Sequence, residues 1–180
     1  GDELSRMRAM LGLMFVEIFY NRLKSAEDYL EKASGYICRN PDCLSEGHIY
    51  SGRMMIKTRY GKYREAENDV KKLLDLSEKM NDSFFVSMAC YHKSRIEQME
   101  GRWADSSETI DRGLNANPSN LLLLASKVFM EYATGNYEEG DFYRKRILAI
   151  HRRTPSGPYL AHLHAASTEA VRARNTGNPE

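Results

Sequence analysis

Apolar residues recur at steps of three and four along most of the chain, which is the spacing of one face of a helix. In the first segment these positions are Met7, Met10, Leu11, Met14, Phe15 and Ile18. Eight further segments show the same period, and no stretch has the sustained alternation with β-branched residues that a strand requires. The sequence therefore predicts nine helices, at 4–19, 23–37, 44–59, 63–80, 84–100, 103–115, 121–134, 137–151 and 159–174.

A short motif recurs between these helices: a glycine, an aromatic residue two positions later, and a small residue three positions after that. Complete copies begin at Gly61, Gly101 and Gly135, and a truncated copy begins at Gly177. A degenerate copy begins at Asn21, since asparagine also tolerates the left-handed conformation that glycine supplies. The copies start at positions 21, 61, 101, 135 and 177, so their spacings are 40, 40, 34 and 42 residues.

Each part of the motif has a role in a helical hairpin. The glycine ends one helix in a left-handed cap, the aromatic residue begins the next helix, and the small residue lets the two helices approach closely. The sequence thus predicts an all-α fold, an α-solenoid of antiparallel hairpins with about four and a half repeats. We expect one array over residues 1–180, with hairpins at about 4–37, 44–80, 84–115 and 121–151, then an unpaired helix at 159–174. Because the last helix ends at a turn motif without its second helix, we expect a longer parent array.

These residues resemble the tetratricopeptide repeat (TPR) family, whose unit is about 34 residues with a turn, an aromatic residue and small residues at fixed offsets. The unit at 121–154 has this length, and Asn117-Pro118-Ser119-Asn120 is similar to the family's inter-repeat Asn-Pro-x-Asn. The 40- and 42-residue units depart from the pattern, as do Met14 and Met54, where the family often has glycine or alanine. The longer units look more like the repeat region of large bacterial regulators, either LuxR-type activators with a signal-transduction ATPase or TPR-tailed nucleotide cyclases.

The resemblance implies a non-catalytic module that binds a protein or peptide partner within a transcriptional or signalling regulator of the bacterial cytoplasm. In TPR arrays the first helix of each hairpin lines a concave surface. Counting back from each turn places on that surface Phe15 and Ile18; His48, Ser51, Met55 and Arg59; Tyr91, Arg95 and Gln98; and Ala125, Phe129 and Tyr132.

The chemistry of these positions leaves several interpretations open. Arg59 and Arg95 would bind a carboxylate or phosphate, or they would pair with Glu97 or Glu131 on neighbouring helices. The aromatic residues would hold apolar or ring surfaces. A groove of this kind would instead serve a sensor of a small ligand, such as a sugar, peptide or nucleotide. The methionine-rich first helix or the uncapped last helix would also offer a face for a homodimer.

The charge balance argues against direct binding to nucleic acid or to a membrane. Lys and Arg number 26 and Asp and Glu 25, so a net charge of +1 produces no broad attraction to an anionic partner. The longest apolar run, at 9–16, is far shorter than the roughly 20 residues of a membrane span. Three cysteines at irregular spacing fit a reducing cytoplasm better than a disulfide framework.

No local motif proposes catalysis. The chain has no Gly-x-x-x-x-Gly-Lys-Ser/Thr loop and no signature that joins a nucleophile, a base and an orienting group, so we expect neither an enzyme nor a bound cofactor. Cys38, Cys43 and His48 would supply three ligands to zinc, but four residues separate the cysteines where two are usual. We therefore predict no metal site and interpret this segment as an ordinary loop between repeats.

Overall fold

The computed structural model describes residues 2–39, 41–153 and 159–177, and within the last of these ranges it describes the side chains of 166–174 and 177. The described chain is helical and contains no strand, which confirms the all-α prediction. The helices are α1 (Glu3–Phe19), α2 (Leu23–Ile37), α3 (Cys43–Arg59), α4 (Tyr63–Met80), α5 (Ser83–Met99), α6 (Trp103–Ala116), α7 (Leu121–Ala133), α8 (Tyr137–Arg153) and α9 (Tyr159–Thr176). Every predicted segment coincides with one of them, with bounds that agree within two residues.

The first residue of each motif copy has the left-handed conformation that the motif predicts. The φ angles of Asn21, Gly61, Gly101, Gly135 and Gly177 are 59°, 73°, 76°, 86° and 67°. At Gly101 the glycine amide donates to the Gln98 carbonyl at 3.1 Å, and the next amide, of Arg102, donates to the Glu97 carbonyl at 2.8 Å. This pair of bonds defines a Schellman cap. The same pair occurs at the other three hairpin turns, at positions 21, 61 and 135.

The small residue five positions after each turn residue is buried against the partner helix. Ala26, Ala66 and Ser106 are each 0% exposed, and Gly140 is also buried. A Cβ added at Gly140 would lie 2.8 Å from Cδ1 of the Tyr132 ring, closer than real contacts allow. The two helices of each hairpin therefore approach at a place where a larger side chain would separate them.

A glycine on the facing helix accommodates Met14, which stands where the TPR family often has a small residue. A Cβ added at Gly52 of α3 would overlap the sulfur and the terminal methyl of Met14, which is 0% exposed. Helices α1 and α3 therefore approach closely where the large side chain of Met14 on α1 packs against Gly52 on α3.

The first helix of each hairpin begins at a side-chain cap. The carboxylates of Asp2, Asp42 and Asp82 and the amide oxygen of Asn120 accept hydrogen bonds from the first backbone amides of α1, α3, α5 and α7. These amides have no partner inside the helix, so an acceptor at this position stabilises the helix start by about 1 kcal/mol.

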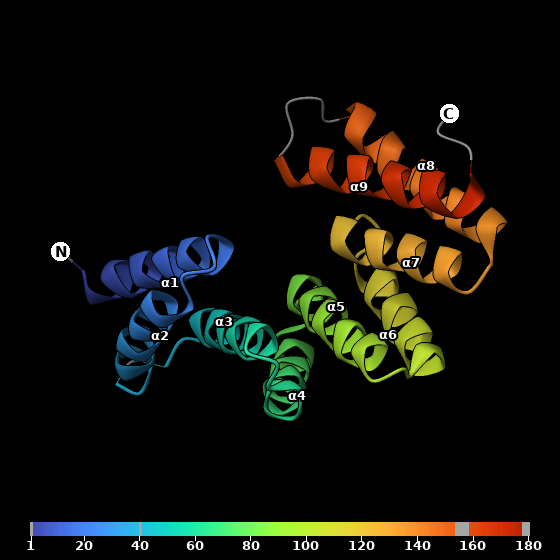
Figure 1. Ribbon diagram of the computed structural model, residues 1–180. Coiled ribbons are helices and arrows are strands. Elements are labelled where there is room, and N and C mark those ends of the chain that lie inside the picture. Colours follow the sequence, from blue (N-terminus) through green and yellow to red (C-terminus); the bar gives the residue numbers. More distant parts are fainter. Residues whose placement is uncertain (1, 40, 154–158, 178–180) are drawn as a thin grey trace.

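The helices form a row in which each contacts its neighbours in sequence. The odd-numbered helices also contact one another in succession, α1 with α3, α3 with α5, α5 with α7, and α7 with α9. Figure 1 shows the odd-numbered helices along the inner side of an open arc, with α2, α4 and α6 on its outer side. We call the side formed by the odd-numbered helices the inner face.

The apolar core is divided into three clusters, each completed by the following hairpin. The first contains residues of α1 and α2 together with Ile49 and Ile56 of α3. The second joins α3 and α4 to Ala89 and Ile96 of α5, and the third joins Cys90 and residues of α6 to α7 and α8. Each cluster therefore spans a junction between hairpins, so that stacking buries what one hairpin leaves exposed.

Candidate functional site

A depression of about 280 Å³ lies on the inner face where α5, α7 and α9 meet. Its walls include Tyr91 and Arg95 from α5, Leu122, Ala125 and Phe129 from α7, and Thr168 and Val171 from α9. We call it the α5–α7–α9 pocket. The sequence placed Tyr91, Arg95, Ala125 and Phe129 on one binding surface, and the structure brings these four side chains together.

Helical spacing explains why these residues share the pocket. Tyr91 and Arg95 are four positions apart on α5, and Ala125 and Phe129 are four apart on α7, so each pair lies on one side of its helix. Phe129 is 44% exposed, and the side chains of Tyr91 and Arg95 are partly buried. The pocket is thus a shallow apolar depression with one cationic group at its edge.

Arg95 is an available hydrogen-bond donor within the part of the chain that the structure describes, since it forms neither a hydrogen bond nor an ion pair there. None of the described residues that line the pocket is acidic. A planar guanidinium with these surroundings is suited to a carboxylate, which it binds through two parallel hydrogen bonds.

The buried His92 lies on α5 between Tyr91 and Arg95 in sequence. Burial, and to a lesser extent the positive charges of Arg95 and Arg59, lower the pKa of His92 to about 4. Its Nε2 is buried and has no hydrogen-bond partner among the described residues. His92 is therefore neutral at physiological pH and adds no positive charge to this part of the inner face.

His48 lies in a different depression, of about 290 Å³, between α1 and α3. Its ring stands edge-on to Phe15 of α1 at 5.9 Å and to Phe85 of α5 at 5.1 Å between centroids. Burial lowers the pKa of His48, while the charges of Asp82 and Asp42 oppose that shift. His48 thus belongs to an aromatic contact between three odd-numbered helices and lies outside the α5–α7–α9 pocket.

Arg59 and Met55 also lie outside the pocket. Arg59 is exposed at the end of α3, where its Nη1 donates to Oδ1 of Asn21 at 3.1 Å. Met55 is partly buried against the first core cluster. The alternative pairing of Arg59 and Arg95 with Glu97 or Glu131 is wrong, because Lys93 and Arg102 bind Glu97. Glu131 is bound instead by Lys127, with Nζ and Oε1 3.4 Å apart.

The predicted groove is wrong at Gln98 and Tyr132, because both side chains point toward the second helix of their own hairpin. Gln98 Nε2 donates to Ser106 Oγ at 3.1 Å, and the Tyr132 hydroxyl donates to Asp141 Oδ1 at 2.5 Å. Each stands three residues before its turn glycine and packs on the small residue five positions after it, Ser106 or Gly140. The two remaining positions, Ile18 and Ser51, are likewise buried.

Sequence reasoning missed a recurring polar contact at the turns, in which a buried glutamate before the turn binds the residue that follows the turn glycine. Glu97 is 0% exposed, and its Oε1 lies 2.5 Å from Lys93 Nζ and 3.5 Å from Arg102 Nη1. Glu131 stands at the same place before the next turn, and its Oε2 accepts from Asn136 Nδ2 at 2.9 Å. The signal was an acidic residue four positions before the turn glycine with a polar residue one position after it. These bonds stabilise turns and explain buried charge without invoking function.

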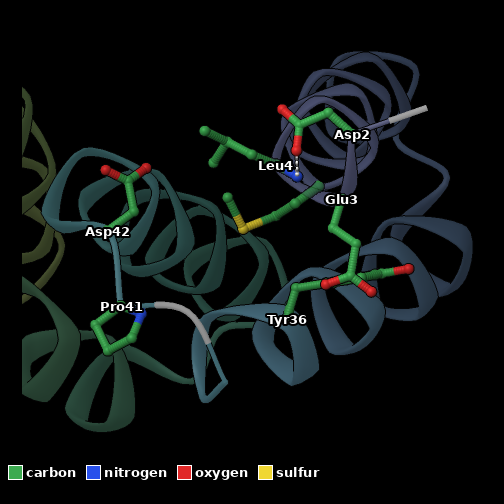
Figure 2. A pocket seen from close by; sticks show the side chains of 7 residues that line it. Asp2, Glu3, Leu4, Tyr36, Pro41 and Asp42 are labelled. Atoms are coloured by element: carbon green, nitrogen blue, oxygen red, sulfur yellow. Dashed lines mark hydrogen bonds between the residues drawn. The ribbon is translucent and has the colours of Figure 1, made fainter.

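A larger depression, of about 540 Å³, lies beside the start of α1 and is lined in part by Asp2, Glu3, Tyr36 and Asp42. Figure 2 shows Asp2, Glu3 and Tyr36 on one side and Asp42 on the other. Asp2 and Asp42 accept from the amides of Leu4 and of Ser45, both at 3.2 Å. Two of its carboxylates therefore cap helices, and we do not choose this depression as the binding site.

The described residues contain no group of three or more His, Cys, Asp or Glu side chains placed to hold a metal ion. Cys38 and Cys43 are free and exposed, and Cys90 is free and buried. The raised pKa of Tyr132, to about 12, has a structural cause, since its ring is buried and its hydroxyl is bonded to Asp141. Among the described residues, no helix is both long enough and apolar enough to cross a membrane.

In comparisons with known proteins, no family model, no curated protein and no solved structure matches the chain. The interpretation of its function therefore depends on its own residues and geometry. The TPR resemblance, based on the motif at Gly61, Gly101 and Gly135, stays a prediction.

Proposed function

We propose that the chain is a TPR-like α-solenoid that acts as a non-catalytic protein-binding module, with its inner face as the binding surface. The recurring turn conformation and the core clusters shared between successive hairpins support the solenoid. The observation that carries the binding function is the α5–α7–α9 pocket, where Tyr91, Arg95 and Phe129 converge from two helices and none of the described lining residues is acidic.

The ligand that suits this pocket is a peptide segment with a carboxylate next to an apolar or aromatic side chain. The carboxylate binds the Arg95 guanidinium, and the apolar group packs between Tyr91 and Phe129. The volume of about 280 Å³ is slightly below the range of roughly 300–1,000 Å³ that small-molecule sites occupy. A peptide is therefore preferred over a small soluble signal, which is the alternative ligand.

The parent protein in this proposal is a bacterial transcriptional or signalling regulator of the cytoplasm, in which partner binding to the array changes how the attached domains are arranged. The long repeat units support this context. The three free cysteines support a reducing compartment.

Selection from a random peptide library displayed on phage tests the proposal. Peptides that bind the immobilised chain should be enriched in Asp or Glu beside apolar residues. Fluorescence anisotropy should then show that Arg95→Glu weakens binding by about tenfold or more, as expected for a lost charge-assisted bond. The matched control is Arg64→Glu, an exposed position on α4 that should leave the affinity unchanged.

Circular dichroism on both variants establishes that they fold. Equal affinities of Arg95→Glu, Arg64→Glu and the unaltered chain for the selected peptides would refute the inner-face site. Failure to select any peptide above background would refute the proposed ligand class.

A further inference from the structure

The outward side of α1 carries an uncharged stripe that no other described helix covers. Ala9, Gly12, Leu13 and Val16 are exposed, with Leu13 at 44% and Val16 at 46%. Ser5 and Tyr20 extend the stripe in both directions at helical spacing, and both are exposed. The opposite side of α1 carries the buried residues Met7, Leu11, Met14 and Ile18. Helix α1 therefore has two apolar sides, of which only one is packed against the row.

Three positions of this stripe correspond to positions that are buried in the other odd-numbered helices. In α1, the positions twelve, nine and five residues before the turn residue are Ala9, Gly12 and Val16. The corresponding residues are Ile49, Gly52 and Ile56 in α3, Ala89, His92 and Ile96 in α5, and Leu123, Ser126 and Met130 in α7, and all are buried. The large apolar members lie in core clusters that contain residues of the preceding hairpin. The same helix side is thus a packing surface in α3, α5 and α7.

The order of side-chain sizes along the stripe indicates what covers it in α1. The first half carries the small residues Ser5, Ala9 and Gly12, and the second half carries Leu13, Val16 and Tyr20. A second α1, packed antiparallel about a two-fold axis between residues 12 and 13, would place Gly12 at the level of Leu13 of the other copy, on opposite edges of the stripe. The same axis would place Ala9 opposite Val16, and Ser5 opposite Tyr20. Each small residue then shares its level with a large one, which suits close helix packing.

We propose that this chain forms a homodimer in which the α1 stripes of two copies pack antiparallel. The interface is isologous, because one surface patch meets itself across a two-fold axis. Apart from the neighbouring residues and the adjacent backbone of α1 itself, no atom of the described residues lies within 4 Å of a Cβ position at Gly12, so a side chain from the second copy has room at the crossing point. The α5–α7–α9 pocket lies on helices that α1 does not contact, so the α1 stripe and the pocket are separate surfaces.

Light scattering coupled to size exclusion, over a range of protein concentrations, tests the dimer. The mass should rise from 20.7 kDa toward twice that value as concentration increases. Val16→Glu buries a charge only in the dimer and should shift the midpoint to about tenfold higher concentration or more. The matched control is Phe142→Glu, an apolar position on α8 that is 53% exposed and should dimerise like the unaltered chain.

A single mass of 20.7 kDa at every concentration would overturn the proposal, and so would equal dimerisation of Val16→Glu and Phe142→Glu. Either outcome leaves peptide binding at Arg95 unaffected, so the two proposals fail separately. If another protein or a further hairpin of a longer chain covers the stripe, the isolated chain will show the first of these outcomes.

Crosslinking tests the antiparallel arrangement. In a background of Cys38→Ser and Cys43→Ser, the only remaining thiol is that of the buried Cys90. A short bis-maleimide should join Ala9→Cys to Val16→Cys when the two variants are mixed, and should join neither variant to itself. Crosslinking of each variant to itself, with no product in the mixture that joins Ala9→Cys to Val16→Cys, would show a parallel pair and overturn the two-fold axis proposed here.

Discussion

Acidification from pH 7 to pH 5 is expected to weaken the fold through His92, whose buried ring has no hydrogen-bond partner for Nε2 among the described residues. The ordinary histidine pKa of 6.5 falls to about 4 in the folded chain, first because of burial and then because of the charges of Arg95 and Arg59. Below pH 6.5 the unfolded chain binds a proton that the folded chain does not accept. The unfolding equilibrium therefore shifts toward the unfolded state as the pH falls.

The magnitude follows from the two pKa values. Stability from this group is complete well above pH 6.5, falls between pH 6.5 and about 4, and is constant below that window. Proton linkage converts the shift to a loss of about 2 kcal/mol between pH 7 and pH 5. The lowered pKa of His48 acts in the same direction and adds to the total loss.

Urea unfolding followed by far-ultraviolet circular dichroism at pH 7, 6 and 5 measures the loss directly. His92→Gln removes the titrating group, so its loss between pH 7 and pH 5 should be smaller than that of the unaltered chain by about 2 kcal/mol. Arg95→Gln should reduce the loss more weakly, because one of the two charges that lower the His92 pKa is gone. Parallel pH dependences for the unaltered chain and His92→Gln would show that His92 titrates alike in both states and refute this reasoning.

Two further predictions concern stability at neutral pH. Gly61→Ala should lower the free energy of unfolding by about 1 kcal/mol because φ is positive there, whereas Gly35→Ala, in α2 with open space around it, should raise it by a few tenths. Thermal melts of the two variants check this, and equal shifts would contradict the left-handed turn. Lys93→Met removes a partner of the buried Glu97 and should cost about 1–3 kcal/mol, whereas Lys24→Met, whose side chain is 84% exposed, should cost less than about 0.5. Equal chemical stability of these two lysine variants would show that the Lys93 pair contributes nothing.

The positions of the helices were predictable because the signals that start and end them are local. The spacing of apolar residues shows where a helix runs. The acceptors Asp82 and Asn120 mark helix starts, and the left-handed residues Gly101 and Gly135 mark helix ends. A hydrogen bond from one turn to the preceding turn needs no information from distant helices. For this reason the predicted bounds differ from the observed ones by no more than two residues.

The candidate site was predicted only in part, because the direction of a side chain on the inner face depends on the next helix. Tyr91, Arg95 and Phe129, which the sequence placed on one surface, line the same pocket, whereas Gln98 and Tyr132 turn toward α6 and α8. Gln98 and Tyr132 turn inward because the small residues Ser106 and Gly140 leave space for them on the second helix of the hairpin. The spacing of residues along one helix does not show which residue of the next helix will lie opposite.

The sequence by itself determined the helices of the described chain, their turns and the places where two helices can approach closely, since each depends on short-range backbone geometry. Only the tertiary structure decided that Arg95 is unpaired among the described residues while Glu97 is buried in ion pairs. It also decided that no other described helix covers the α1 stripe, whereas the positions corresponding to Ala9, Gly12 and Val16 are buried in α3, α5 and α7. Burial and pairing depend on which helix faces are brought together in space, and the spacing of residues along one helix does not contain that information.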